Sequence, residues 1–281
     1  GGFVAGVVQA LRERGAALPG LELAISSTVP AGSGLSSSSA LSVALTIALA
    51  EAAEVVLPAD EIARAALDAE IRATGVPGGL MDQLTSVHGV ADHVLLIDCR
   101  TLAVEPIPLL PELTVLVVHS GMPRTLAGSA YAERRTATEQ AAARLGIATL
   151  RDASLDAVAD DPFARHVVTE NARVLAFADA LRAHDVDALG PVLLASHASL
   201  RDDFAVSTPE LDLLVDAFMA AGALGARLTG AGFGGCVVGL ARTSDASGVL
   251  DRAVERYRSA SGREPSGFVV RAVAGAGTVA P

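Results

Sequence analysis

The 281-residue sequence contains no lysine, so all 21 of its basic residues are arginine. This absence excludes several kinds of site. A Walker A loop places a lysine on the β- and γ-phosphates, a protein kinase uses a strand lysine, and a Schiff base needs an amine. A phosphate site in this chain must therefore depend mainly on backbone N–H groups, hydroxyls and a metal ion.

Cysteine, clustered histidine and positive charge are also scarce. Cys99 and Cys236 are far apart and have no cysteine or histidine neighbours at metal-ligand spacing, so we expect both to be packed thiols. The six histidines form no metal-binding motif, and we expect ordinary surface or core residues. The net charge of -11 argues against binding to nucleic acid or an anionic membrane, because such binding needs a positive surface.

The sequence lacks a long uninterrupted apolar run. Its most apolar stretch, residues 40–57, is broken by Glu51 and Glu54 and is too short for a membrane span of about 20 residues. No basic segment followed by an apolar one stands at the N-terminal end, so we expect no signal peptide and a cytoplasmic location. With 51% hydrophobic and 19% charged residues, the chain is expected to fold into two globular domains.

Local patterns predict a mixture of helices and strands in the first part of the chain. Residues 21–26 alternate apolar and polar side chains, which predicts a half-buried strand. A glycine- and serine-rich loop leads from there to an alanine-rich helix over residues 40–54. A second helix is predicted from Asp60, as N-cap, to Thr74, with Gly75 and Pro77 ending it, and a short third helix near Gly79.

The second part begins with buried strands and ends with glycine-rich ones. Strands are predicted over residues 93–98 and 113–119, and the prolines between them mark a boundary between domains 1–110 and 111–281. Residues 129–146 and 164–218 are predicted to be mostly helical, with Thr208 as a cap and Pro209 at a first helical position. A glycine loop running into a strand is predicted at residues 231–240, and a last strand at residues 267–273.

The loop of residues 30–39 is the first candidate site. A loop that leads from a strand to a helix N-terminus directs free N–H groups and the positive end of the helix dipole at one point. Gly32 and Gly34 would let the backbone approach phosphate oxygens, and the serine hydroxyls could bind phosphate or magnesium. The alternative is a flexible connection with a good helix cap.

Two carboxylates are further candidates. Glu70 leans toward the apolar side of its predicted helix, where it could be a magnesium ligand opposite the serines or pair with an arginine at the edge. Asp82 falls in the first turn of a short helix. It could accept the proton of an attacking hydroxyl, or it could simply complement the helix dipole.

Residues 230–235 match the dinucleotide-binding pattern G-x-G-x-x-G, but that pattern requires a following helix. The alternation of residues 236–240 predicts a strand instead. The loop is therefore either a tight bulge or a second approach of the backbone to bound substrate and phosphates.

These elements, in this order, resemble the GHMP small-molecule kinases. The family has a Pro-x-x-x-Gly-Leu-Ser-Ser-Ser loop and a late glycine loop, matched here by residues 30–38 and 230–235. Longer strings narrow the resemblance to the galactokinases, namely those beginning at Gly79, Leu95, Tyr131, Ser196 and Thr229. The resemblance implies an α+β fold of two domains, with a truncated N-terminal domain and a ferredoxin-like C-terminal domain.

The same resemblance implies an activity and roles for residues. It implies ATP-dependent phosphorylation of D-galactose at its 1-hydroxyl by a monomeric enzyme with Mg²⁺, and no nucleic-acid or membrane partner. Asp82 would face the hydroxyl, Ser38 and Glu70 would hold magnesium, and Gly79, Asp82, Tyr131, Gly230 and Gly232 would contact the sugar. The triphosphate would lie against Pro30, Gly32, Ser33, Gly34, Leu35, Ser36, Ser37 and Ser38.

The resemblance also implies about a hundred residues upstream of Gly1, with a catalytic arginine and a Gly-Glu-His-x-Asp string that grips the sugar. No Glu-His pair occurs in the present sequence. We therefore expect galactokinase chemistry, either intact or impaired in this chain. The alternatives are another sugar kinase of the same superfamily and a non-catalytic sensor of sugar or nucleotide.

Overall fold

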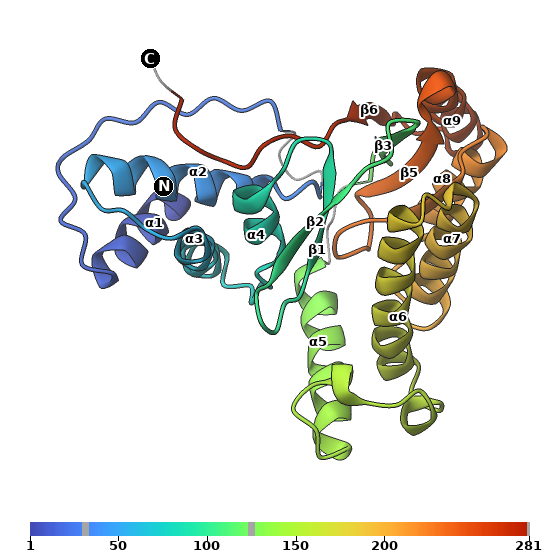
Figure 1. Cartoon of the computed structure of the whole chain (residues 1–281), viewed down its shortest axis with the longest axis horizontal. Coiled ribbons are helices and arrows are strands. Elements are labelled where there is room, and N and C mark those ends of the chain that lie inside the picture. The colour runs from blue at the N-terminus through green and yellow to red at the C-terminus, as the bar shows by residue number, and fades with distance from the viewer. Residues whose placement is uncertain (30–33, 123–126, 280–281) are drawn as a thin grey trace. The chain divides into compact units, whose positions relative to one another are not determined.

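A computed structural model describes residues 1–29, 34–122 and 127–279. The chain forms two compact units, which are described separately (Figure 1). One contains Leu35–Ile107, the described residues before Pro30 and the terminal segment from Ala272; the other contains Pro108–Arg271. Within the described ranges, no helix combines the length and the apolar character needed to cross a bilayer.

Helices dominate the first unit. Its elements are α1 (Gly2–Glu13), α2 (Ser37–Ala52), α3 (Ala59–Thr74), α4 (Met81–His88), and the two paired strands β1 (His93–Ile97) and β2 (Val104–Pro108). The helices pack through small side chains, which let their backbones approach closely. At Gly6 of α1, an added Cβ would lie 2.6 Å from the carbonyl oxygen of Ala69 in α3. The apolar faces of α1, α2 and α3 bury Val7, Leu11, Leu45 and Leu49.

The strand predicted at residues 21–26 is wrong. None of the described strands includes this segment, and Leu21, Leu23 and Ile25 are 45%, 40% and 57% exposed. Alternation makes a strand only where a neighbouring strand accepts the backbone hydrogen bonds, and no described strand pairs with these residues.

The boundaries of α2, α3 and α4 agree closely with the sequence, apart from one cap, whereas α1 was not predicted. Gly75 ends α3 in the left-handed conformation, with φ 71°, as predicted. Asp60 is not the N-cap, however, because Pro58 takes that position and Asp60 lies in the first turn. The proline-containing segment after β1 also differs from the expected linker, since residues 104–108 form β2. A two-stranded sheet has open edges, and proline is tolerated on an edge strand.

The second unit is built around an antiparallel sheet with the order β4-β5-β3-β6. The strands are β3 (Leu113–His119), β4 (Gly225–Leu228), β5 (Cys236–Arg242) and β6 (Ser266–Val270). The helices are α5 (Ala127–Arg144), α6 (Pro162–Arg182), α7 (Val186–Asp202), α8 (Pro209–Ala220) and α9 (Ala246–Ser261), with short 3₁₀ turns at Leu150–Asp152, Asp156–Val158 and Thr243–Asp245.

Counting α5–α8 as one helical layer, this unit has the β-α-β-β-α-β order of a ferredoxin-like domain. The α+β class and the ferredoxin-like C-terminal part are therefore confirmed. The Thr208 cap is confirmed as well, since its Oγ1 accepts a hydrogen bond from the Leu211 N–H at 3.3 Å and Pro209 begins α8. The last strand ends at Val270, three residues earlier than predicted.

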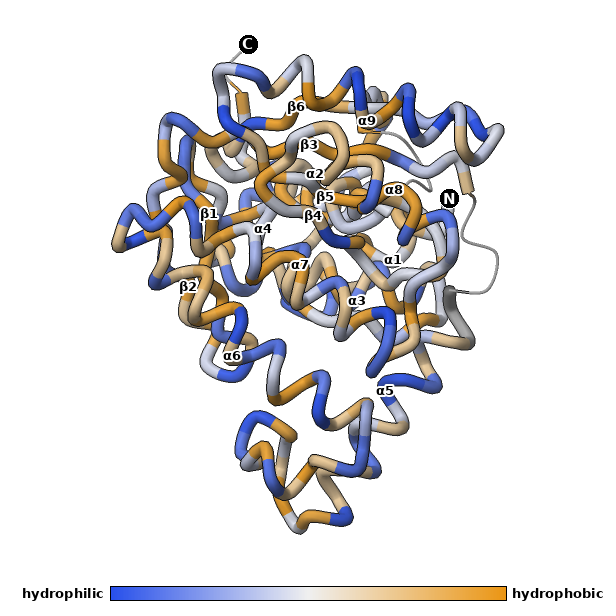
Figure 2. Tube along the Cα trace, turned by 90° about the vertical axis from the view of Figure 1, so that its right-hand side faces the viewer, coloured by the Kyte–Doolittle hydropathy of each residue, from blue (hydrophilic) through white to orange (hydrophobic). Residues whose placement is uncertain are grey.

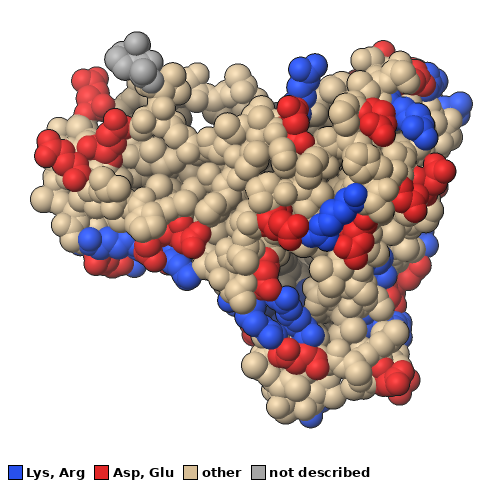
Figure 3. All heavy atoms as spheres, viewed as in Figure 1, with Lys and Arg blue, Asp and Glu red and all other residues tan. Residues whose placement is uncertain are grey.

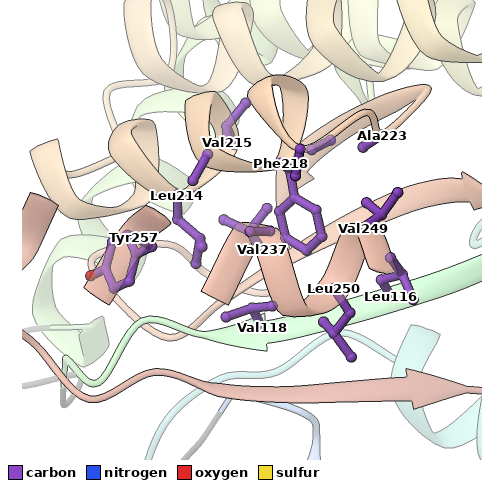
Figure 4. Packing of buried hydrophobic residues seen from close by; sticks show 14 of the residues in the cluster. Leu116, Val118, Leu214, Val215, Phe218, Ala223, Val237, Val249, Leu250 and Tyr257 are labelled. Carbon is purple, nitrogen blue, oxygen red and sulfur yellow. The ribbon is translucent and has the colours of Figure 1, made fainter. Parts of the chain in front are cut away.

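The core of the second unit lies between the sheet and α8 and α9. Phe218 and Leu214 point from α8 toward Val237 of β5, and Val249 and Leu250 extend from α9 (Figure 4). Gly239 makes room for this packing, because an added Cβ would lie 2.7 Å from the Phe218 ring. Figure 2 correspondingly shows β3 and β5 in the colour of hydrophobic residues. Over α6–α9, at the right of Figure 3, acidic and basic side chains are interspersed.

Candidate active site

The N-terminal end of α2 has the backbone form that an anion site requires. Gly34 and Ser36 both have left-handed backbone, with φ 82° and 53°, and α2 begins directly afterwards at Ser37. Within the described chain the Ser36 side chain makes no capping hydrogen bond, and the first turn contains no acidic residue. The first-turn N–H groups therefore keep their capacity to bind an anion. Of the predicted loop residues, Pro30, Gly32 and Ser33 lie outside the described residues, while Leu35 and Ser37 are half-buried.

Glu70 faces the serines of α2, as one of its two predicted roles requires. Ser38 Oγ donates to Glu70 Oε1 at 2.6 Å, and Ser39 Oγ donates to Glu70 Oε2 at 2.8 Å. No arginine among the described residues pairs with this carboxylate, so the alternative of an edge salt bridge is not what the fold produces. The hydrogen bond between Ser38 and Glu70 joins residues that are 32 positions apart in the sequence.

Gln83 completes this cluster, and the sequence analysis did not select it. Its Nε2 donates to Glu70 Oε2 at 2.8 Å and to Ser39 Oγ at 3.3 Å, and the residue is 1% exposed. Gln83 directly follows Asp82 in α4, so one amide connects that helix to α2 and α3. Gln83 is the last residue of the string beginning at Gly79 that carried the resemblance, and this is the signal that could have identified it. Gln83 Oε1 is buried with no partner in the described structure.

Asp82 lies half-buried in the first turn of α4. No arginine or hydrogen-bond donor from the described part of the chain contacts its carboxylate, which leaves both oxygens able to accept a proton or a hydrogen bond. Gly79 is exposed two residues before the helix and has open space where a side chain would be. The far end of α4 is held by the terminal segment, where the Ala276 N–H donates to the Ser86 carbonyl at 2.7 Å.

The oxygen atoms around Glu70 fit a small divalent cation. Mg²⁺ prefers oxygen ligands and is usually held by one or two protein carboxylates together with water and phosphate. Ser38 Oγ and Glu70 Oε1 supply a hydroxyl and a carboxylate oxygen side by side. A cage built from protein side chains alone is absent, since no group of three or more acidic, histidine or cysteine residues gathers in the described structure.

The glycine loop of residues 230–235 connects β4 to β5 in the second unit. Gly230, Gly232, Phe233, Gly234 and Gly235 all have positive φ angles, and β5 follows at once. The interpretation of a loop entering a strand is confirmed, and a dinucleotide-binding helix is excluded at this position. Gly232 has no space for a side chain, because an added Cβ would lie 2.2 Å from the Val206 carbonyl oxygen.

Tyr131 lies in the first turns of α5 and is half-buried. Like the glycine loop, it belongs to the second unit. The first unit thus brings Ser38, Glu70 and Gln83 into contact, and the second contains the remaining predicted sugar contacts.

The cysteines and two buried histidines are placed by packing. Cys236 is buried at the start of β5 as expected, whereas Cys99 is exposed in the turn after β1, so the prediction of a packed thiol is wrong there. His166 Nδ1 lies 2.9 Å from Ser199 Oγ, and burial lowers the pKa of His166 to about 4. His197 Nε2 lies 3.1 Å from Asp212 Oδ1, and burial lowers its pKa too, against the effect of that carboxylate. Both are core residues.

Comparison with family models places the chain among small-molecule kinases. The model described as GHMP kinases N terminal domain matches residues 2–90, and the model described as GHMP kinases C terminal matches residues 177–259. A galactokinase from Roseiflexus sp. (strain RS-1) is 44% identical, and one from Chloroflexus aurantiacus is 42% identical. Each match runs over 292 residues, 99% of this chain and 75% of the relative.

Solved structures give the same result. The crystal structure of Lactococcus lactis galactokinase complexed with galactose superposes with a TM-score of 0.87 at 30% identity, over 97% of this chain and 75% of that one. A homoserine kinase from Cytophaga hutchinsonii shares the fold, with a TM-score of 0.66 at 17% identity, over 97% of this chain and 76% of the other.

Proposed function

This chain belongs to the galactokinase family of the GHMP kinases, and from that premise we propose how its own residues transfer the γ-phosphate of ATP to D-galactose. Residues 1–110 are the N-terminal domain of this fold and residues 111–281 the C-terminal domain, with the segment from Ala272 returning to pack on the first unit. The positions of the two family matches, 2–90 and 177–259, support this division.

The triphosphate binds at the N-terminal end of α2. The loop with Pro30, Gly32, Ser33 and Gly34 and the residues from Leu35 to Ser38 supply N–H groups and hydroxyls, in a chain that has no lysine to do so. The left-handed backbone at Gly34 and Ser36 and the lack of an acidic residue in the first turn of α2 support this role.

Ser38 and Glu70 are the residues that would hold Mg²⁺. When bound, the ion would neutralise phosphate charge and stabilise the charge that develops during transfer. In the structure, the Ser38 hydroxyl donates a hydrogen bond to Glu70 Oε1. With the ion bound, the same hydroxyl would turn a lone pair of Oγ toward the ion.

Asp82 is the catalytic residue in this proposal. Its carboxylate accepts the proton of the 1-hydroxyl while that oxygen forms a bond to the γ-phosphorus, and the bond from phosphorus to the β,γ-bridging oxygen breaks. The products are galactose 1-phosphate and ADP. Gly79, Tyr131, Gly230 and Gly232 contact the sugar and orient it, and correct orientation of reactants is a large part of catalysis by kinases.

The observation that carries the proposal is the cluster of Ser38, Glu70 and Gln83. It places two oxygens suited to magnesium at a helix N-terminus and is linked through Gln83 to the helix that bears Asp82.

The test is galactose-dependent release of ADP from ATP in the presence of Mg²⁺, comparing the wild-type chain with Asp82→Asn. Glu51→Gln, which changes an exposed carboxylate near the C-terminal end of α2, is the control. Asp82→Asn should reduce kcat by about 100-fold or more while nucleotide still binds. Equal turnover by wild type and Asp82→Asn would refute the role of Asp82. Binding of ATP without turnover by the folded wild-type chain would indicate either impaired galactokinase chemistry or a sensor.

A further inference from the structure

The corner that follows α7, residues 204–206, has strained backbone. Ala205 adopts φ 53°, in the left-handed region that non-glycine residues rarely occupy. Such conformations persist where surrounding contacts enforce them, and they concentrate at functional sites. The corner begins at Phe204, the last residue of the string that starts at Ser196 and carried part of the resemblance to galactokinases, yet the proposed function gives the corner no role.

Arg134 of α5 holds this corner from one side. Its Nε donates to the Phe204 carbonyl at 2.7 Å, and its Nη2 donates to the Ala205 carbonyl at 3.2 Å. The guanidinium also lies over the ring of Phe163, 4.7 Å from its centroid. Its side chain is only 18% exposed, and its nearest carboxylate, Glu133, is 4.0 Å away and 72% exposed. The main partners of this cation are therefore backbone carbonyls and an aromatic face.

The glycine loop of residues 230–235 holds the same corner from the other side. The Phe233 N–H donates to the Val206 carbonyl at 2.8 Å, and Gly232 packs so closely on Val206 that a side chain would not fit. Phe233 itself has φ 58°, a second left-handed non-glycine residue. The Phe233 ring faces Arg134, 6.0 Å from its guanidinium carbon. Arg134 thus contacts both the corner and the loop.

These contacts join two elements that the proposed function assigns to the sugar. Tyr131 and Arg134 are three residues apart in α5 and therefore lie on the same face of the helix. Gly230 and Gly232 belong to the loop that the corner holds.

We propose that Arg134 is a positioning residue, which fixes the glycine loop relative to the helix face that bears Tyr131. This inference rests on the proposed roles of Tyr131, Gly230 and Gly232. Lysine could not substitute, because its single ammonium cannot form two fixed hydrogen bonds and stack on a ring at once.

The first test is hydrogen–deuterium exchange of the full chain without ligand, comparing wild type, Arg134→Gln and Arg135→Gln. Arg135 is the matched control, since it is the next arginine of the same helix and its side chain pairs with Glu139 within one turn. In Arg134→Gln, peptides covering residues 203–206 and 230–235 should exchange about tenfold faster, while peptides of β3 and β5 keep wild-type protection. Arg135→Gln should match wild type throughout.

The second test is steady-state kinetics on the same variants and on Arg134→Lys. Arg134→Gln and Arg134→Lys should both lose about tenfold or more of kcat/KM for galactose, with a smaller change in KM for ATP. A residue that only stabilised the fold would lower the fraction of folded enzyme, which would reduce kcat and leave the KM values for galactose and ATP as in wild type.

Two results would overturn the proposal. One is loop exchange in Arg134→Gln that is no faster than in Arg135→Gln. The other is a faster loop in Arg134→Gln together with galactose kinetics equal to those of Arg135→Gln. Different results would contradict the proposed function: unchanged galactose kinetics in Tyr131→Phe, or no turnover by the wild-type chain. The hydrogen–deuterium exchange comparison tests the role of Arg134 whether or not the proposed function holds.

Discussion

A single amide, that of Gln83, has a large influence on the candidate metal site. Glu70 Oε2 accepts from Ser39 and Gln83, while Oε1 accepts only from Ser38 among the described donors. If Ser38 turns toward a cation, the orientation of the carboxylate depends on the two bonds to Oε2. Loss of a group that orients a metal ligand in this way typically lowers metal affinity or activity by about 10- to 100-fold.

Gln83→Met tests this dependence with a side chain of similar size and no donor. We expect the Mg²⁺ concentration for half-maximal turnover to rise about tenfold, because Glu70 loses one of its two remaining donors. The measurement is a magnesium titration of turnover at saturating ATP and galactose. Gln9→Met removes an exposed glutamine of α1 that bonds only within its own helix, and it should leave the titration unchanged. An unchanged curve for Gln83→Met would remove Gln83 from the site.

At the scale of elements, the distance between α1 and α3 is set by a glycine. Gly6 of α1 is buried against Ala69, and Glu70 is the next residue of α3. Any side chain at position 6 must push the two helices apart, because the atom it meets is a backbone oxygen and not the end of a flexible side chain.

Gly6→Ala should therefore lower the free energy of unfolding by about 1–3 kcal/mol. It should also reduce turnover, since a shift of α3 disturbs the position of Glu70 against the serines of α2. Gly2→Ala, on the same helix, is the control. Its added methyl would make ordinary contacts of 3.7–3.8 Å with Ala73, and its stability should stay within about 0.5 kcal/mol of wild type. Urea unfolding followed by circular dichroism measures the free energy of unfolding of both variants. Equal values for Gly6→Ala and Gly2→Ala would contradict the steric argument.

The elements that the sequence predicted well are those specified by local signals. Alanine-rich α2, Gly75 at the end of α3 and the Thr208–Pro209 start of α8 each depend on residues within a few positions. The strand predicted at residues 21–26 failed because pairing depends on a distant neighbour, and β4, only four residues long, was missed. The same limit applied to Glu70, for which the sequence left a magnesium ligand and an arginine pair both open, since its serine partners lie 31 and 32 residues earlier in the chain.

At the scale of the whole molecule, acid should unfold the second unit through its buried histidines. The pKa of His166 is lowered to about 4 from 6.5, first by burial and further by the nearby cations Arg173 and Arg227, while Glu170 and Asp203 act in the opposite direction. Between these two values the unfolded chain binds a proton that the folded chain does not. The stabilisation is therefore complete above pH 6.5 and is lost as the pH falls toward 4.

His166→Gln should reduce the dependence of the free energy of unfolding on pH between pH 6.5 and 4. In wild type, the free energy of unfolding should decrease between pH 6.5 and 4 with a slope that approaches about 1.4 kcal/mol per pH unit for each proton taken up on unfolding. Urea midpoints measured across this range give the slope, which is independent of any uniform loss of stability in the variant. His197, whose pKa is also lowered, should leave a residual slope. The carboxylates Glu170 and Asp203 have pKa values lowered from 4.5 and 3.8, so their stabilisation is lost as the pH falls through those values. The contribution of Glu170 overlaps the lower end of the window, and the slopes are therefore compared above about pH 5. An unchanged slope in His166→Gln would mean that His166 is protonated inside the folded unit, with Asp203 and Glu170 compensating for its burial.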